Sequence, residues 1–157
     1  MRELKVKKNV QKWIEGSLND PIVKILIKNS HLTETQIETL LIDVLATNLS
    51  EKQLKYEEKA RLRLGKTKVS RGAFNRTLKQ AQKNVIKSIY TIFLLGYLGV
   101  FEHTSLDSYL EIANKLETYI TTYRNTLGTL KGSDEKAKAI NSFREELQVV
   151  LEQLSRP

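Results

Sequence analysis

Residues 69–85 read VSRGAFNRTLKQAQKNV, and this stretch decides the expected fold. Its apolar residues recur at steps of four, three and four, which places them on one face of an α-helix. They are Phe74, Leu78, Ala81 and Val85. The opposite face is polar and mostly basic, with Arg71, Asn75, Arg76, Lys79 and Lys83. Ser70 immediately precedes Arg71 and suits the N-cap position, so we predict a long amphipathic helix that begins near Arg71.

A second amphipathic helix is predicted before this stretch. Thr33 and Gln36 stand at the spacing of a capping box, and Asn48 suits the end of the helix. The apolar residues between them again follow steps of three and four. The expected inner face consists of Ile37, Leu40, Leu41, Val44 and Leu45.

Between these two helices lies a third predicted helix. Ser50 and Gln53 repeat the capping-box spacing, and Gly65 suits the position that follows a helix C-terminus. We therefore expect a helix from about residue 51 to residue 64, followed by a short connector.

The N-terminal part predicts two short helices separated by a break. Residues 9–18 carry Val10, Trp13 and Ile14 on one side of the first helix. Asp20 and Pro21 then mark a restart, because an aspartate can cap a helix and proline suits its first position. The apolar run that follows, residues 22–27, fits a buried helix; a strand is the alternative because the run is short and β-branched.

The C-terminal part predicts a helical hairpin. Residues 89–101 are apolar on all sides, and Gly96 and Gly99 are expected to end or bend that helix. Such a run is usually buried, here either between the two parts of the chain or across a dimer. From about residue 105 the apolar spacing is helical again, with a turn around Gly128 and residues 131–133. The predicted fold is therefore all-α.

We expect two domains. Residues 1–101 form a helical head. Residues 102–157 form an antiparallel hairpin whose apolar stripes favour a homodimer.

The charge distribution points to a polyanionic partner. The chain has a net charge of +8, but residues 51–88 alone hold twelve basic and three acidic side chains. Residues 89–100 hold no charge, and residues 101–157 are slightly acidic. A basic block of this kind is typical of nucleic-acid binding, although a solvated helix face that keeps the protein soluble is the alternative.

The segment from 32 to 85 resembles the helix-turn-helix of region 4 of bacterial sigma factors, of related response-regulator heads and of archaeal Tfx-type regulators. The resemblance rests on three pieces that begin LTETQ, YEEKA and VSRGA. The matching residues are Leu32, Thr33, Gln36, Tyr56, Glu57, Glu58, Ala60, Leu64, Gly65, Val69, Ser70, Arg71 and Gly72. Lys59 departs from the pattern, because the family has an apolar residue there. The turn from Gly65 to Ser70 is also three residues longer than usual.

The resemblance implies that residues 1–101 are a helical DNA-binding head with a helix-turn-helix-like part at about 32–85. This docking mode also predicts which residues contact DNA. The N-terminal part of a recognition helix lies at base edges in the major groove, which points to Ser70, Arg71, Asn75 and Lys79. Phosphate contacts are expected from Arg76 and Lys83 and from two residues of the turn, Lys66 and Lys68. For Arg71 the alternative is a bond to a local carboxylate, Glu57 or Glu58.

Catalysis finds no support in the sequence. The chain has no Cys, and its two His residues, His31 and His103, are far apart. We therefore expect no enzyme activity, no cofactor and no metal site. The N-terminus has no signal-peptide core, so we expect a cytoplasmic, nucleoid-associated protein.

We expect double-stranded DNA as the partner and no integral membrane segment, because residues 85–101 are shorter than the roughly 20 residues of a span. Two alternatives to DNA binding stay open: a helical module that binds an acidic protein, and a peripheral membrane protein that uses residues 89–101. RNA in place of DNA is also open.

Overall fold

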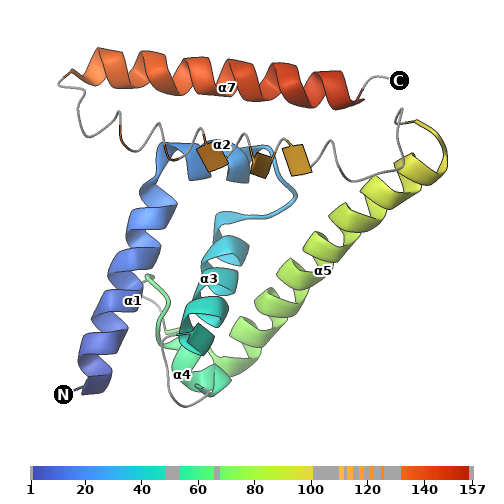
Figure 1. Ribbon diagram of the computed structural model, residues 1–157. Helices are drawn as coiled ribbons and strands as arrows, with labels where there is room; N and C mark the ends of the chain where they lie inside the picture. Colours follow the sequence, from blue (N-terminus) through green and yellow to red (C-terminus); the bar gives the residue numbers. More distant parts are fainter. Residues whose placement is uncertain are drawn as a thin grey trace. The chain divides into compact units, whose positions relative to one another are not determined.

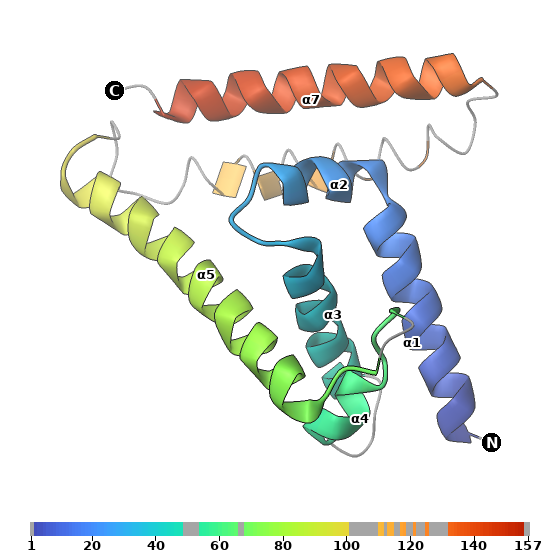
Figure 2. The same cartoon turned by 180° about the vertical axis from the view of Figure 1, so that it is seen from behind.

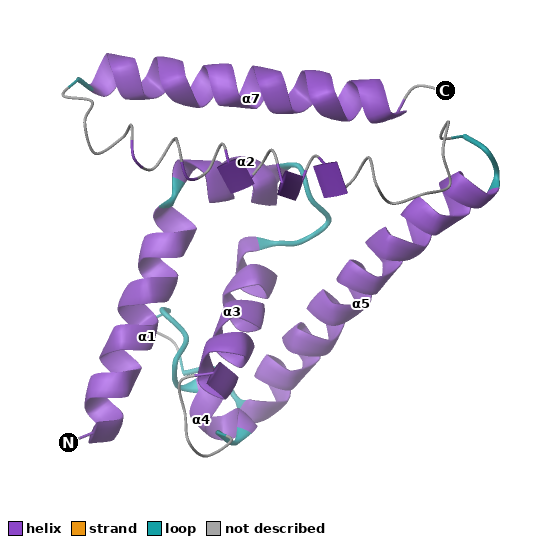
Figure 3. Ribbon diagram, viewed as in Figure 1, coloured by secondary structure: helices purple, strands orange, loops and turns teal. Residues whose placement is uncertain are grey.

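The computed structural model describes residues 2–48, 54–65, 68–100 and 132–155, together with scattered positions between 110 and 125. Every regular element among these residues is a helix and none is a strand, which confirms the all-α prediction (Figure 3). Labelled as in Figure 1, the helices are α1 (Arg2–Asn19), α2 (Pro21–Lys28), α3 (Glu34–Asn48), α4 (Tyr56–Ala60), α5 (Arg71–Tyr97) and α7 (Ser133–Ser155).

The chain divides into two compact units, Met1–Ser88 and Ile89–Pro157, and α5 contributes residues to both. The boundary expected between residues 101 and 102 borders residues that the structure does not describe. The first unit contains most of the predicted site.

The junction between α1 and α2 forms as predicted. Asp20 caps α2 by accepting hydrogen bonds from the backbone N–H groups of Ile22 (2.8 Å) and Val23 (3.4 Å). Pro21 occupies the first position of α2, where its missing N–H removes no helical hydrogen bond. The run 22–27 is thus helical and not a strand, although within it only Ile22 is fully buried.

The first helix is longer than predicted and buries a narrower side. It begins at Arg2, not at residue 9. Val10, Ile14 and Leu18 are buried at a spacing of four, whereas Trp13 is 52% exposed. The prediction that Trp13 shares the inner side is wrong, because one residue of an α-helix turns the side chain by roughly 100°.

Helix α3 is capped as predicted, but it buries a different row of side chains. Thr33 Oγ1 accepts the N–H of Gln36 (3.2 Å), and Gln36 Oε1 accepts the N–H of Thr33 (3.1 Å). The buried row contains Thr39, Ile42 and Ala46. The expected inner residues flank this row: Ile37, Leu40, Leu41 and Leu45 are half-buried and Val44 is exposed.

A polar contact explains this rotation of α3. The hydroxyl of Thr39 donates to the carbonyl of Thr35 (2.7 Å) and accepts a hydrogen bond from Arg63 (2.7 Å). Because the hydroxyl is fully satisfied, Thr39 can be buried completely without the cost of an unpaired polar group.

The third predicted helix is shorter than expected. Helix α4 covers only Tyr56–Ala60 and is preceded by Lys55 at the N-cap, whose N–H donates to Glu58 (2.7 Å). The predicted cap Ser50 lies outside the described residues, as does the start of the predicted helix. Residues 61–64, predicted as helix, form a turn and an irregular segment instead.

Helix α5 begins and ends where the sequence indicates. The Ser70 hydroxyl accepts the N–H of Ala73 (3.2 Å), so Ser70 is the N-cap. At the other end Gly99 has a φ of 70°, and the N–H groups of Gly99 and Val100 bond back to the carbonyls of Gly96 and Leu95. This is a Schellman motif, in which a left-handed glycine terminates the helix.

The first unit has one apolar core. Its centre is Phe74, which is 0% exposed. The other buried members come from α1, α3, α4, the residues after α4, and α5: Val10, Ile14, Leu18, Ile42, Ala46, Ala60, Leu62 and Leu78. Figures 1 and 2 show α4 between the C-terminal end of α3 and the start of α5. The first turns of α5 are therefore packed firmly against the rest of this unit.

The second unit contains the end of α5, helical positions between 110 and 125, and α7. Within α7, Phe143 is buried, whereas Val149 and Leu151 are exposed. The turn predicted around Gly128 and Lys131 lies outside the described residues, so the antiparallel hairpin stays a prediction. Contrary to the burial expected for residues 89–101, Tyr90 and Tyr97 are largely exposed in the single chain. Burial across a dimer stays a prediction.

Candidate nucleic-acid interface

Helix α5 presents a row of cations on the side opposite its buried face. Phe74, Leu78 and Ala81 are buried, as predicted, whereas Val85 is partly exposed. At roughly 100° per residue, the side chains of residues 76, 79 and 83 leave the helix within about 60° of one another, opposite the buried row. All three are exposed. We call Arg76, Lys79 and Lys83 the basic ridge.

The residues predicted to read bases lie less favourably than the ridge. Ser70 is exposed, but its hydroxyl is engaged in capping α5. Asn75 is half-buried, because it lies on the flank of α5 that turns toward Leu78. Arg71 is exposed at the first position of α5. Of the four predicted readers, Arg71 and Lys79 are thus the charged groups that reach solvent.

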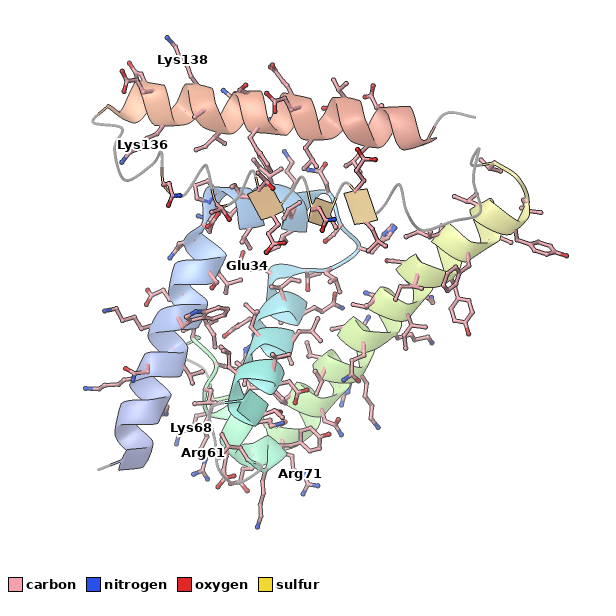
Figure 4. All side chains as sticks on the ribbon, in the orientation of Figure 1. Glu34, Arg61, Lys68, Arg71, Lys136 and Lys138 are labelled. Atoms are coloured by element: carbon pink, nitrogen blue, oxygen red, sulfur yellow. The ribbon has the colours of Figure 1, made fainter. Side chains whose placement is uncertain are left out.

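The two turn lysines have different outcomes. Lys68 is exposed, whereas Lys66 lies outside the described residues. Figure 4 shows Lys68, Arg61 and Arg71 at the same end of the first unit, where α4 meets the start of α5. Glu34 lies at the other end of α3. This end of the first unit therefore carries basic groups next to the start of α5.

The basic residues of α4 and of the turn after it have structural partners. Lys59 is only 5% exposed, and its Nζ lies 2.7 Å from Asp43 Oδ1 and 5.6 Å from the centre of the Tyr56 ring. The aliphatic stem of Lys59 and its paired charge allow this side chain to be buried. Sequence reasoning missed this role, because the partner lies sixteen residues away on another helix.

Arg63 forms a second ion pair between this segment and α3. Its Nε lies 3.0 Å from Glu38 Oε2, and its Nη1 donates to Thr39 Oγ1 (2.7 Å) and to the Thr35 carbonyl (3.2 Å). Glu38 Oε1 also accepts the N–H of Leu64 (2.6 Å).

The same segment is also bonded to α1. The Gln11 side chain donates to the carbonyls of Leu62 and Arg63, both at 3.3 Å. The Gln11 amide thus satisfies carbonyls of a kind that the last turn of a helix leaves without a partner. The Leu64 N–H, which a helix continued to residue 64 would donate to the Ala60 carbonyl, is bound by Glu38 instead, so α4 ends at Ala60.

Arg71 and the three ridge cations of α5 have no such partner among the described carboxylates. None of the ion pairs between described residues involves Arg71, Arg76, Lys79 or Lys83. The local carboxylates considered for Arg71 are engaged elsewhere: Glu57 pairs with Arg61 (2.6 Å), and Glu58 accepts the N–H of Lys55. Helix α5 itself contains no Asp or Glu.

This arrangement costs helix stability. Arg76, Lys79 and Lys83 follow one another at steps of three and four, where like charges destabilise a helix by about 0.2–0.5 kcal/mol per pair. Arg71 also places a positive charge at the positive end of the helix dipole, and the first turn has no acidic residue. A stripe that serves only to solvate the helix needs no such clustering.

No protein-family model, curated protein or solved structure matches this chain. The resemblance to sigma-factor region 4 and Tfx-type regulators therefore stays a prediction.

In the part of the chain that the structure describes, no helix has the length and apolar character needed to cross a bilayer. The same residues contain no cluster of three or more His, Cys, Asp or Glu side chains that is arranged to bind a metal ion.

Proposed function

We propose that this protein binds double-stranded DNA through the exposed face of α5, as a transcriptional regulator or a DNA-organising factor. The observation that carries the proposal is the basic ridge, which projects from a helix whose opposite face is buried at Phe74 and Leu78. Lys68 and Arg71 extend the positive surface at the start of that helix. DNA presents closely spaced phosphates, so several cations fixed on one rigid helix gain contacts together.

The rigidity of α5 supports this assignment. A B-form major groove is about 12 Å wide and accepts one α-helix. Cations on a mobile segment lose side-chain and backbone entropy when they bind, whereas those of α5 stand on a helix that is already ordered. We further propose that two copies associate through apolar surface. A twofold dimer places two α5 helices on half-sites about one DNA turn apart.

Charge reversal on α5 tests the proposal. Replacing Arg71, Lys79 and Lys83 with Glu should lower the affinity for duplex DNA by at least roughly 100-fold at about 0.1 M salt, because three phosphate contacts become repulsive. Helicity measured by circular dichroism should be unchanged, because the three side chains are exposed.

A matched control separates location from net charge. Lys24, Lys136 and Lys138 are exposed on α2 and α7, and replacing them with Glu changes the net charge by the same amount. This control should retain most of the affinity. An equal loss of DNA affinity in both variants would contradict a binding site on α5. If the protein binds no DNA, binding to an acidic protein would favour a protein-interaction module, and binding to anionic vesicles would favour a peripheral membrane protein.

A further inference from the structure

The chemistry of the exposed face of α5 indicates which feature of DNA it recognises. Arg76, Lys79 and Lys83 lie opposite the buried row, with Gly72 preceding them and the exposed Lys87 following them on the same side. A Cβ added at Gly72 would meet no atom within 4 Å, so this position is open and contributes no side chain. The projecting row therefore offers cationic groups only.

The neutral polar side chains in this half of α5 are mostly engaged within the protein. The hydroxyls of Ser70 and Thr77 bond to the backbone of Ala73. The Asn84 amide donates to the carbonyl of His31 (3.1 Å) and lies 3.4 Å from Gln36 Oε1. Neutral side chains that are already bonded to the protein are poorly placed to contact base edges, so the base contacts open to this face are mainly those of its cations with guanine acceptors.

Two exposed amides remain, at the borders of the row. At roughly 100° per residue, Gln80 leaves the helix about 40° from Arg76, and Gln82 about 60° from Lys79. If the ridge meets the DNA first, the cations contact phosphates before either amide reaches a base. Asn75, the remaining amide, is half-buried.

The ridge residues have no exposed aromatic ring between them, although Tyr56 of α4 and Tyr90 and Tyr97 farther along α5 are exposed. Proteins that bind single strands without sequence preference stack bases on exposed aromatic rings that lie between basic groups. In the part of α5 before Ser88 the aromatic residue is Phe74, which is fully buried. The ridge therefore matches the regular phosphate array of a duplex better than an unstacked strand.

We infer that α5 recognises the phosphate backbone of duplex DNA independently of base sequence. This inference rests on the proposed function and specifies its ligand: any duplex, contacted by Lys68, Arg71, Arg76, Lys79 and Lys83. Five phosphate contacts imply that the logarithm of the binding constant falls with the logarithm of salt concentration with a slope of roughly −4.5.

Fluorescence anisotropy with the full chain tests this inference. The probes are duplexes of equal length with mixed, A·T-only and G·C-only sequence, a single strand of the mixed sequence, and an unlabelled pool of random duplexes as competitor. We expect the three duplexes to bind within about threefold of one another, more tightly than the single strand. Replacing Arg76, Lys79 and Lys83 with Gln should make the salt slope shallower by roughly 2.7.

The outcomes separate this inference from the proposed function. A duplex selected from the random pool that binds a hundredfold or more tighter than the others would overturn sequence independence and leave DNA binding intact. Preference for the single strand, or an unchanged salt slope in the triple variant, would also overturn the inference. Failure of every duplex to bind at low salt would overturn the proposed function as well.

Discussion

Two neighbouring segments of the first unit are both strongly basic, yet they use their charges differently. In residues 55–64, Lys59 and Arg63 are withdrawn from solvent and paired with Asp43 and Glu38 of α3. In α5, the ridge cations are exposed and have no described carboxylate as partner. The net charge of the sequence does not distinguish the cations of residues 55–64 from those of α5. Burial and ion pairing show which cations stabilise the fold and which are available to contact a ligand.

The comparison predicts its largest effect at Glu38. Replacing Glu38 with Ala should lower the free energy of unfolding by about 3–5 kcal/mol, because it leaves the Arg63 charge partly buried without its partner and removes the acceptor of the Leu64 N–H. Urea denaturation measures this loss. Glu34 is the matched control, since it is an exposed glutamate in the first turn of α3.

Replacing Glu34 with Ala should cost at most about 1 kcal/mol, the usual value of a favourable charge at a helix N-terminus. If the two glutamate variants are equally stable, the Arg63 pair does not hold the segment after α4.

A smaller effect is expected at the start of α5. Replacing Ser70 with Ala should cost about 1 kcal/mol, because the Ala73 N–H loses its acceptor, whereas Gly at the same position should cost only a few tenths. Thermal or urea unfolding of the two variants checks the difference. If the Ala and Gly variants lose the same free energy of unfolding, the Ser70 side chain does not stabilise the start of α5.

Much of the local structure could be predicted, because its signals are contained within a few residues. The caps at Asp20, Thr33 and Ser70 each depend on a polar side chain two to three residues from the backbone group that it satisfies. The inner face of α5 follows from the helical spacing of Phe74 and Leu78, which are both buried. The all-α class follows from the same short-range patterns.

The tertiary contacts could not be predicted, because they join residues that are distant in the sequence. The early end of α4 and the burial of Lys59 depend on carboxylates of α3, and the rotated inner face of α3 depends on the bond between Thr39 and Arg63. Within the candidate site, periodicity placed Asn75 and Lys79 on the same polar face. It did not show that Asn75 is half-buried and that the ridge projects farther.

The most direct measurement compares two lysines, one from each segment. Lys59→Gln and Lys83→Gln each remove one positive charge, and both the unfolding free energy and the affinity for a duplex should be measured for each variant. We expect Lys83→Gln to lower the affinity roughly eightfold at about 0.1 M salt and to leave the stability within about 0.5 kcal/mol of the parent protein. Lys59→Gln should lose about 1–3 kcal/mol of stability and keep its affinity within about twofold, because its ammonium group is already paired with Asp43. If both lysine variants lose affinity equally, or if Lys83→Gln affects stability alone, the separation of structural from ligand-binding cations is contradicted.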